Sequence, residues 1–327
     1  MQISKEQDKS QIMNQAFAED VNKGLSSKNK YLESKYFYDD KGDQLFQKIM
    51  GLSEYYLTDC EFEILFENRD VYREYFQNTR TSFSLIELGA GDGLKTKILL
   101  RHFYQHNTDF TYLPIDISGN VLSLLQKDLR DELPGLHMQT FQGDYFDALK
   151  NLNATNSNRK VILFLGSTIG NFAHEQAIDF LQKLNENMNP DDQLLIGFDL
   201  KKDPRIILRA YDDEDGVTRA FNLNLLERIN RELGGEFNTD NFYHYPTYDP
   251  VTGETKSFLI SKRAQDVYIR GLQKNFHFHM GEPIFMEISQ KYDLENIRNL
   301  ASKTGFKIED NFFDTRKFYT NSLWIKK

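Results

Sequence analysis

The fold is decided by Ser84-Leu-Ile-Glu-Leu-Gly89-Ala-Gly91-Asp-Gly93-Leu-Lys95-Thr-Lys-Ile-Leu-Leu100. The apolar start of this stretch is typical of a buried parallel strand. Its three glycines, at alternate positions, allow a sharp turn and a close approach of the backbone to a ligand. Helical spacing follows from 96 to 103. A strand, a glycine turn and a helix in this order present backbone N–H groups to a nucleotide or a nucleoside.

Two further turns follow apolar strands where a nucleoside site would use them. Asp116 ends the strand that starts at Tyr112, and a carboxylate at this place typically accepts hydrogen bonds from ribose hydroxyls. Gly143-Asp144-Tyr145 follows an expected strand at 138–141, where such proteins contact adenine. A dinucleotide fingerprint would need glycine at 94, where Leu94 stands. Three unrelated turns could leave the same residues, but their shared order and spacing favour one nucleoside-binding fold.

The composition is that of a globular protein with one large or two modest domains. The chain has 327 residues, 39% of them hydrophobic and 13% aromatic, which excludes global disorder. A net charge of −9 without a strongly basic patch argues against nucleic acid as a partner. The single cysteine, Cys60, excludes an internal disulfide and suggests no cysteine-based zinc site. Because neither a signal-peptide start nor a long apolar run is present, we expect a cytoplasmic monomer with no membrane partner.

Strands and helices are expected to alternate between 83 and 200. The pattern places strands near 83–88, 111–115, 138–141, 160–165 and 193–199, and helices near 94–105, 118–130 and 174–188. This alternation predicts a parallel sheet whose ligands bind at the carboxyl ends of the strands. The polar segment 151–159 is expected to be a surface loop. Two final strands, at 306–313 and 321–325, would complete a seven-stranded sheet with its last strand antiparallel.

The regular alternation stops after Asp199. An amphipathic helix is expected from 217 to 233, and the segment 240–285 alternates apolar and polar residues as antiparallel strands do. We expect this insertion to pair with the N-terminal segment as a lid. Within that segment, Asp40-Lys41-Gly42 is typical of a turn. Thr58 and Glu61 have the spacing of a capping box that opens a helix through about residue 68.

Several residues outside the glycine turn are candidates for a substrate site. Asn171 ends the segment Gly166-Ser-Thr-Ile-Gly-Asn171 after the fourth strand, and its amide offers both a donor and an acceptor. For Tyr38 and Tyr55, ordinary aromatic packing is the alternative to a place in a pocket wall, and for Glu287 it is a surface charge. His277 and His279 share a strand face without a third ligand nearby in sequence. We therefore expect a solvated strand face there and predict no metal.

Several motifs together resemble one family. They are Phe37-Tyr38-Asp39 with Leu45-Phe46, Glu54-Tyr55-Tyr56-x-Thr58, Phe164-Leu-Gly-Ser-Thr-Ile-Gly-Asn171, Ala210-Tyr211-Asp-Asp, and Glu287-x-Ser289-x-Lys291-Tyr292. The glycine turn itself resembles motif I of Rossmann-like methyltransferases. From about residue 20 to its end, the chain resembles the histidine-specific methyltransferases of ergothioneine biosynthesis, which make histidine betaine (hercynine).

The resemblance implies an α/β fold with two domains. A Rossmann-like, seven-stranded class I methyltransferase sheet would comprise 61–199 and 288–327. A second, α+β domain that binds substrate would comprise 1–60 and 200–287, and donor and substrate would meet at the seam between sheet and lid. S-adenosylmethionine would be the methyl donor and S-adenosylhomocysteine the product. The residues implied to hold the donor are Gly89, Gly91, Lys95, Asp116, Asp144 and Tyr145.

The implied reaction is trimethylation of the α-amino group of L-histidine. Tyr38 would lie near that amino group, and we nominate its hydroxyl as the acceptor or relay of the departing proton. In one departure from the family, Ser257 stands where a methionine is often found near the substrate, which leaves the selectivity for the side chain open. The residues implied to hold histidine are Tyr55, Asn171, Tyr211, Glu287 and Ser289.

Three other functions stay open on the sequence alone. The first is a methyltransferase that acts on another free amino acid or a small amine. The second is a protein that binds the donor without catalysis, although the donor and substrate motifs both look complete. The third is a nicotinamide-dependent dehydrogenase, which Leu94 disfavours because the dinucleotide turn needs glycine there.

Overall fold

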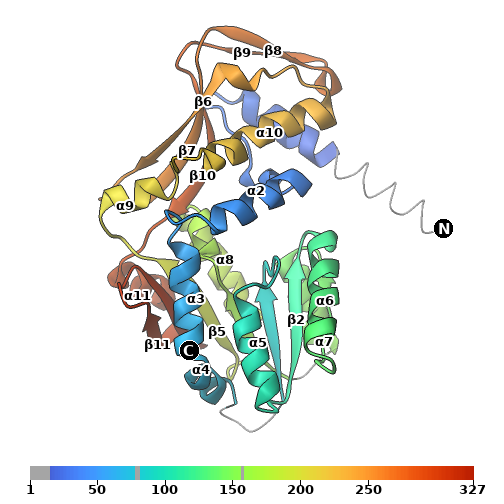
Figure 1. Ribbon diagram of the computed structural model, residues 1–327, viewed down its shortest axis with the longest axis vertical. Helices are drawn as coiled ribbons and strands as arrows, with labels where there is room; N and C mark the ends of the chain where they lie inside the picture. The colour runs from blue at the N-terminus through green and yellow to red at the C-terminus, as the bar shows by residue number, and fades with distance from the viewer. Residues whose placement is uncertain (1–14, 78–81, 156–157) are drawn as a thin grey trace, which may run out of the picture. The chain divides into compact units, whose positions relative to one another are not determined.

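The chain folds as two compact units (Figure 1). The computed structural model describes residues 15–77, 82–155 and 158–327. The sheet unit comprises Leu57–Lys201 and Gln290–Lys327, and the insertion unit comprises the described residues up to Tyr56 together with Lys202–Ser289. Residues 15–26 of the N-terminal segment are helical.

The sheet unit contains a seven-stranded sheet in the order β11-β12-β5-β4-β1-β2-β3. Strands β1 to β5 pair in parallel, while β12 is antiparallel to both β5 and β11. The predicted sheet and its antiparallel last strand are thereby confirmed, but the strand expected at 138–141 is only the two residues Phe141–Gln142. The strands are β1 (Phe83–Leu88), β2 (Phe110–Asp116), β3 (Phe141–Gln142), β4 (Arg159–Phe164), β5 (Gln193–Asp199), β11 (Phe306–Phe313) and β12 (Tyr319–Lys326).

Helices connect the parallel strands, as the alternation predicted. All six residues of β1 and all seven of β5 are buried, which is why these segments are mostly apolar in sequence. The helical elements of this unit are α3 (Leu57–Glu67), α4 (Arg69–Phe76), α5 (Thr96–Gln105), α6 (Gly119–Glu132), α7 (Tyr145–Thr155), η2 (Thr168–Asn171), α8 (His174–Glu186) and α11 (Leu294–Lys303).

Helix α7 corrects the expected loop at 151–159. The helix continues to Thr155, so the prediction of a loop was wrong for its first half. Asp144 begins the helix, because its carboxylate accepts hydrogen bonds from the backbone N–H groups of Phe146, at 2.8 Å, and Asp147. Leu149 and Leu152 then bury one face in the core, which stabilises a helix despite its asparagines.

A buried ion pair joins the end of β5 to the segment after β10. Lys291 Nζ lies 2.8 Å from Asp199 Oδ2, and both side chains are fully buried. The backbone N–H of Tyr292 donates to the carbonyl of Asp199 at 2.9 Å, so the chain is tied at the same place by a second contact. The lysine of the Glu287-to-Tyr292 motif therefore has a structural contact within the sheet unit.

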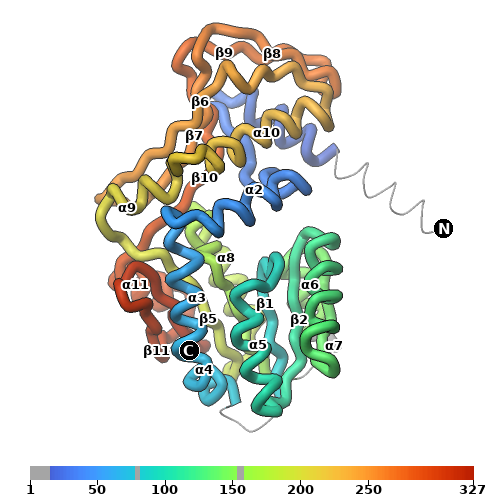
Figure 2. Tube along the Cα trace, in the orientation of Figure 1, coloured from blue at the N-terminus to red at the C-terminus, as the bar shows by residue number. Residues whose placement is uncertain are grey.

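The insertion unit holds a three-stranded sheet, β10-β7-β6, and a two-stranded sheet, β8-β9. In Figure 2 the blue N-terminal segment and the yellow-to-orange insertion both enter this unit. Helix α10 buries the predicted stripe of Phe221, Leu225, Ile229 and Leu233. The elements are η1 (Ser34–Phe37), α2 (Asp40–Met50), α9 (Pro204–Arg209), α10 (Val217–Leu233), η3 (Thr239–Asn241), β6 (Phe242–Tyr248), β7 (Glu254–Ser261), β8 (Gln265–Ile269), η4 (Arg270–Leu272), β9 (Lys274–Phe278) and β10 (Pro283–Gln290).

The expected turn at Asp40-Lys41-Gly42 is instead the first turn of α2. Asp39 is the N-cap, and its carboxylate accepts from the N–H of Gly42 at 2.7 Å. Glycine is required at 42, because a Cβ there would lie 1.8 Å from the carbonyl oxygen of Phe37. This close approach fixes the backbone on both sides of Tyr38. Among the described residues, no helix is long and apolar enough to cross a membrane.

We predict that Lys291→Met lowers the free energy of unfolding by about 3–5 kcal/mol, because it leaves the fully buried Asp199 carboxylate without its ion-pair partner. Urea denaturation followed by circular dichroism measures this change. Lys307→Met is the matched control, since Lys307 pairs with Glu309 at 3.4 Å on the surface and should cost less than about 1 kcal/mol. Equal effects of the two substitutions would contradict a structural role for the buried pair.

Candidate active site

The glycine turn after β1 is open on the side of a ligand. Gly89, Gly91 and Gly93 have φ angles of 74°, 54° and 65°, a region that favours glycine. A Cβ at Gly91 would meet no atom within 4 Å, whereas one at Gly89 would lie 2.9 Å from the Tyr145 hydroxyl. A side chain at 91 would fill the space over the turn, and one at 89 would displace the tyrosine. The turn therefore leaves its backbone accessible to a ligand.

Asp116 stands beside this turn at the carboxyl end of β2. Its Oδ2 accepts from the N–H of Gly91 at 3.1 Å, and its Oδ1 accepts from the N–H of Ser118 at 2.9 Å. The carboxylate is half-buried. Two backbone N–H groups fix its orientation, and each carboxylate oxygen has a further lone pair that can accept a hydrogen bond from a hydroxyl group. This geometry suits the contact with a ribose that the sequence predicts.

Asp144 and Tyr145 lie at the start of α7, next to the same turn. The pKa of the Tyr145 phenol is raised, mainly by burial and further by the charges of Asp116 and Asp144. The phenol is therefore protonated at neutral pH and can donate a hydrogen bond. The structure thus brings together Gly89, Gly91, Asp116, Asp144 and Tyr145, which are five of the six predicted donor residues.

Lys95, the sixth predicted donor residue, has a different contact. Its ammonium forms an ion pair with Glu61 Oε2, and Glu61 is completely buried. Lys95 Nζ also lies 3.4 Å from the point where a Cβ of Gly166 would stand. The lysine therefore spans from the end of the glycine turn to the segment after β4.

Glu61 is a residue of this site that the sequence pattern did not reveal. Its Oε2 accepts from the N–H of Gly166 at 2.8 Å, and its Oε1 accepts from the Tyr319 hydroxyl at 3.0 Å. A Cβ at Gly197 would lie 2.4 Å from Oε1, so β5 needs glycine there to admit the carboxylate. The expected capping box was wrong. Thr58 lies inside α3, and the Glu61 side chain contacts Lys95, Gly166 and Tyr319.

The segment from Gly166 to Asn171 is fixed by its neighbours in the sheet unit. Ser167 has a φ of 55°, and its hydroxyl accepts from the N–H of Asp199 at 3.1 Å. A Cβ at Gly170 would lie 2.9 Å from the carbonyl oxygen of Gln290, so backbone passes closely over backbone. Asn171 then ends η2 as an exposed residue at the carboxyl end of β4.

A second buried carboxylate lies beneath the glycine turn. Glu87 accepts hydrogen bonds from the hydroxyls of Thr96 and Tyr112. Burial raises the pKa of Glu87 from 4.5 to about 7, against the opposing effect of the two hydroxyls and of Lys95. The carboxyl group joins β1, β2 and the first turn of α5 and thereby holds the base of the turn.

In the insertion unit, Tyr211 and Ser289 are in direct contact. The Tyr211 hydroxyl donates to Ser289 Oγ at 2.8 Å, and both residues are buried. Glu287 is half-buried and precedes Ser289 by two residues in β10, so the two share one face of the strand. Ile284 and Met286 on the other face belong to the hydrophobic core. The polar face of β10 thus carries a carboxylate and a hydroxyl side by side.

Tyr38 and Tyr55 are connected through Phe46. The ring of Phe46 makes an edge contact with Tyr38 at 5.6 Å between centroids and with Tyr55 at 6.4 Å. Tyr38 also contacts Phe221 of α10, at 5.8 Å, and keeps 39% of its surface exposed. The aromatic packing expected as the ordinary alternative is therefore present, and it orients both tyrosines.

Asn171 lies in the sheet unit, whereas the other residues predicted to bind histidine lie in the insertion unit. Ser257 of β7 is buried, and its hydroxyl has no hydrogen-bond partner within the part of the chain that the structure describes. Such an atom is suited to a polar ligand or a water molecule.

Comparisons with known proteins show which family the chain is similar to. Residues 17–326 match a family described as histidine-specific methyltransferase, SAM-dependent. A histidine N-alpha-methyltransferase of Mycolicibacterium smegmatis is 34% identical over 90% of this chain and 89% of that protein. Ergothioneine biosynthesis protein 1 of Schizosaccharomyces pombe is 30% identical over 92% of this chain and 40% of that protein. A 4-dimethylallyltryptophan N-methyltransferase of Claviceps fusiformis is 26% identical over 87% and 85% of the two chains.

We predict that Asp116→Ala weakens binding of S-adenosylmethionine by about tenfold or more, since a charged hydrogen bond contributes about 1.5–3 kcal/mol. Isothermal titration calorimetry with the donor measures the change. Asp128→Ala is the control, because Asp128 is an exposed residue of α6 whose partner is Lys97 of α5. This variant should bind the donor as the unchanged protein does. Wild-type affinity of Asp116→Ala would remove Asp116 from the donor site.

The free energy of unfolding is expected to fall between pH 5 and 7, and we predict that Glu87→Gln makes this fall smaller. The pKa of Glu87 is about 7 in the folded chain, against 4.5 as the ordinary value, so between these values unfolding releases a proton. Stability therefore falls as pH rises through this window, by on the order of 3 kcal/mol in total. Urea denaturation of both proteins across the window measures this slope, and parallel pH profiles would contradict a protonated Glu87.

Proposed function

This chain belongs to the histidine-specific, S-adenosylmethionine-dependent methyltransferases, and we propose that it trimethylates the α-amino group of L-histidine to give hercynine for ergothioneine synthesis. The single observation that supports this substrate most strongly is the polar face of β10, where Glu287 lies beside the Tyr211–Ser289 hydrogen bond of 2.8 Å. A carboxylate and two hydroxyls in one unit are suited to hydrogen bonds with the charged groups and the imidazole of a small zwitterion.

The residues at the glycine turn fit S-adenosylmethionine. Open space over Gly91 accommodates a ligand against the backbone, and Asp116 presents oriented carboxylate oxygens to ribose hydroxyls. Asp144 and Tyr145, next to the same turn, would hold the adenine. When bound, the donor supplies a methyl group on a sulfonium, which a neutral amine can displace. No metal is needed for this chemistry.

Selectivity for histidine would rest on Glu287. A carboxylate that accepts a hydrogen bond from an imidazole N–H gains a charge-assisted contact. Substrates without such a donor lose this charge-assisted contact and should therefore bind more weakly. Tyr211 and Asn171 would hold the α-carboxylate and the amine, and Tyr55 would form part of the wall.

The amine must lose a proton before it can attack. Free histidine carries an ammonium group at neutral pH, and Tyr38 is our candidate for the group that accepts the proton or relays it to water. Phe46 and Phe221 hold its ring while the residue stays partly exposed, so the hydroxyl would relay the proton to solvent between rounds. Most of the rate enhancement would come from holding amine and sulfonium in line, for which orientation offers about 7–11 kcal/mol.

Incubation with L-histidine and S-adenosylmethionine, followed by mass spectrometry, tests the proposal. We expect one product that carries three methyl groups on the α-nitrogen, with S-adenosylhomocysteine formed in threefold molar excess over hercynine. A competition assay with the other amino acids and small amines tests the remaining alternative. Faster turnover of any of them than of histidine would overturn the proposed substrate, while an absence of all turnover would favour a protein that only binds the donor.

The alternative substrate class has one observation in its favour. The relative from Claviceps fusiformis is named for a tryptophan derivative, so substrate choice varies among similar chains. In this chain the buried Ser257 hydroxyl lies on β7, the strand next to β10 in the sheet. If Ser257 contributes to selectivity, Ser257→Met changes the ratio of kcat/KM values among amino acids, whereas Ser84→Ala in β1 leaves it unchanged.

The assembly and the location of the protein stay predictions. We propose that the protein is cytoplasmic and binds no nucleic acid. We also propose that it acts as a monomer, because both sets of predicted site residues come from one chain. Gel filtration with light scattering measures the assembly state.

We predict that Glu287→Ala raises the KM for histidine by about 10- to 100-fold, the equivalent of one charged hydrogen bond, and changes the KM for the donor much less. Steady-state kinetics with each substrate varied in turn measures the two constants. Glu254→Ala is the matched control, since Glu254 is a half-buried glutamate of β7 in the same unit. Unchanged histidine kinetics in Glu287→Ala would exclude the residue from the pocket.

A further inference from the structure

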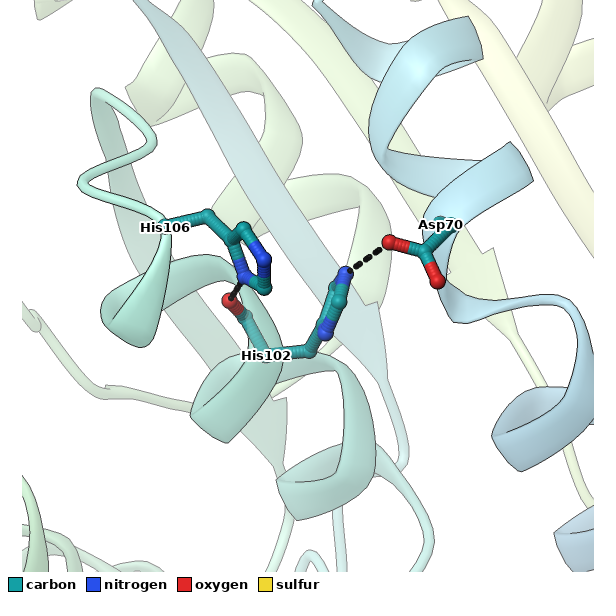
Figure 3. Close-up of side chains that lie close together, drawn as sticks. All are labelled: Asp70, His102 and His106. Atoms are coloured by element: carbon teal, nitrogen blue, oxygen red, sulfur yellow. Dashed lines mark hydrogen bonds and ion pairs between the residues drawn. The ribbon is translucent and has the colours of Figure 1, made fainter.

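Three potential metal ligands converge on the surface of the sheet unit, outside the predicted donor residues. Asp70 comes from α4, His102 comes from α5, and His106 is the residue that caps the C-terminus of α5 (Figure 3). One ligand atom from each residue lies within 4.8 Å of the other two, and no other such group of three occurs among the described residues. His106 follows His102 by four residues, about one helical turn, so the two side chains lie near each other at the end of α5.

His102 has an unusual environment for a surface cluster. Its side chain is only 8% exposed, and its Nε2 lies 2.9 Å from Asp70 Oδ1. This contact is within ion-pair distance, but it is not aligned as a hydrogen bond, and Nε2 has no hydrogen-bond partner among the described residues. Figure 3 shows the nitrogen directed at the carboxylate. A buried ring nitrogen that faces a carboxylate without a proper hydrogen bond is suited to hold a cation between them.

The second imidazole is already oriented as a ligand. His106 Nδ1 lies 2.8 Å from the carbonyl oxygen of His102, and only a protonated Nδ1 can donate to a carbonyl. The proton on Nδ1 leaves the lone pair on Nε2. Metal-ligating histidines characteristically donate their other N–H to a backbone carbonyl or a carboxylate, because this contact fixes the tautomer and the ring. The two rings are close neighbours, 4.2 Å apart between centroids.

We propose that Asp70, His102 and His106 bind one Zn²⁺ ion on the surface of the sheet unit. Two imidazole nitrogens and a carboxylate oxygen are ligands that zinc prefers, and water would complete a tetrahedral set. The ion would join α4 to α5. Because His102 follows the first residue of α5 by six positions, about 9 Å along the helix, the ion would stabilise the scaffold and take no part in methyl transfer.

Zinc binding by the untagged, metal-free protein tests the proposal. Equilibrium dialysis against Zn²⁺ should give one bound ion per chain, and the same ion should raise the unfolding temperature in a concentration-dependent way. Co²⁺ in place of Zn²⁺ should give the visible absorption of a tetrahedral site. His106→Gln and Asp70→Asn change exposed side chains, so they should remain folded while their affinity for Zn²⁺ falls at least tenfold.

The chain contains a matched control of the same residue types. His277 and His279 have rings 4.6 Å apart, and His277 Nδ1 lies 3.0 Å from Asp266 Oδ1. These ligand atoms do not form a converging group of three. The double variant His277→Gln, His279→Gln should therefore keep the full stoichiometry and affinity. Absence of a stoichiometric ion in the unchanged protein would overturn the proposal, as would binding that survives in His106→Gln and is lost in the control. Neither readout depends on methyl transfer, so the proposed function can fail without affecting this result.

Discussion

The buried carboxylate of Glu61 joins three separate segments of the sheet unit. A carboxylate without access to water must be paired and hydrogen-bonded, or its desolvation opposes folding. Here Lys95, the N–H of Gly166 and the Tyr319 hydroxyl meet this need. These partners come from the end of the glycine turn, the segment after β4 and the last strand. One side chain of α3 therefore fixes the relative placement of the segments that carry the donor residues and Asn171.

The two units carry different sets of predicted site residues. The sheet unit carries the glycine turn, the Asp116 carboxylate and the Tyr145 phenol, which we propose to bind the nucleoside of the donor. The insertion unit carries Tyr38, Tyr211, Glu287 and Ser289, which we propose to bind the amino-acid substrate. A family with this organisation can change its substrate through the insertion unit while the donor residues stay the same. The relatives named for histidine and for a tryptophan derivative are consistent with that.

Sequence reasoning succeeded where the signal is local. The bounds of β1 and of α10 follow directly from apolar runs and helical stripes. It failed where a distant contact overrides a local preference. Gly42 looked like a turn residue, but its small size serves a close approach to the carbonyl of Phe37. Glu61 looked like half of a capping box, although its partners lie 34, 105 and 258 residues away in sequence. The pairing of Asp70 with His102 is equally invisible, because it depends on how two helices pack.

Binding of S-adenosylhomocysteine to Glu61→Gln tests the central claim most directly. The amide keeps an acceptor for Gly166 and Tyr319 but removes the charge that holds Lys95, so the account predicts a folded protein that binds the product at least tenfold more weakly. Calorimetry gives the affinity, and circular dichroism confirms the fold. Tyr319→Phe, which removes one neutral donor, should have a smaller effect. A folded Glu61→Gln protein with unchanged affinity would contradict the role of this carboxylate in positioning the donor site.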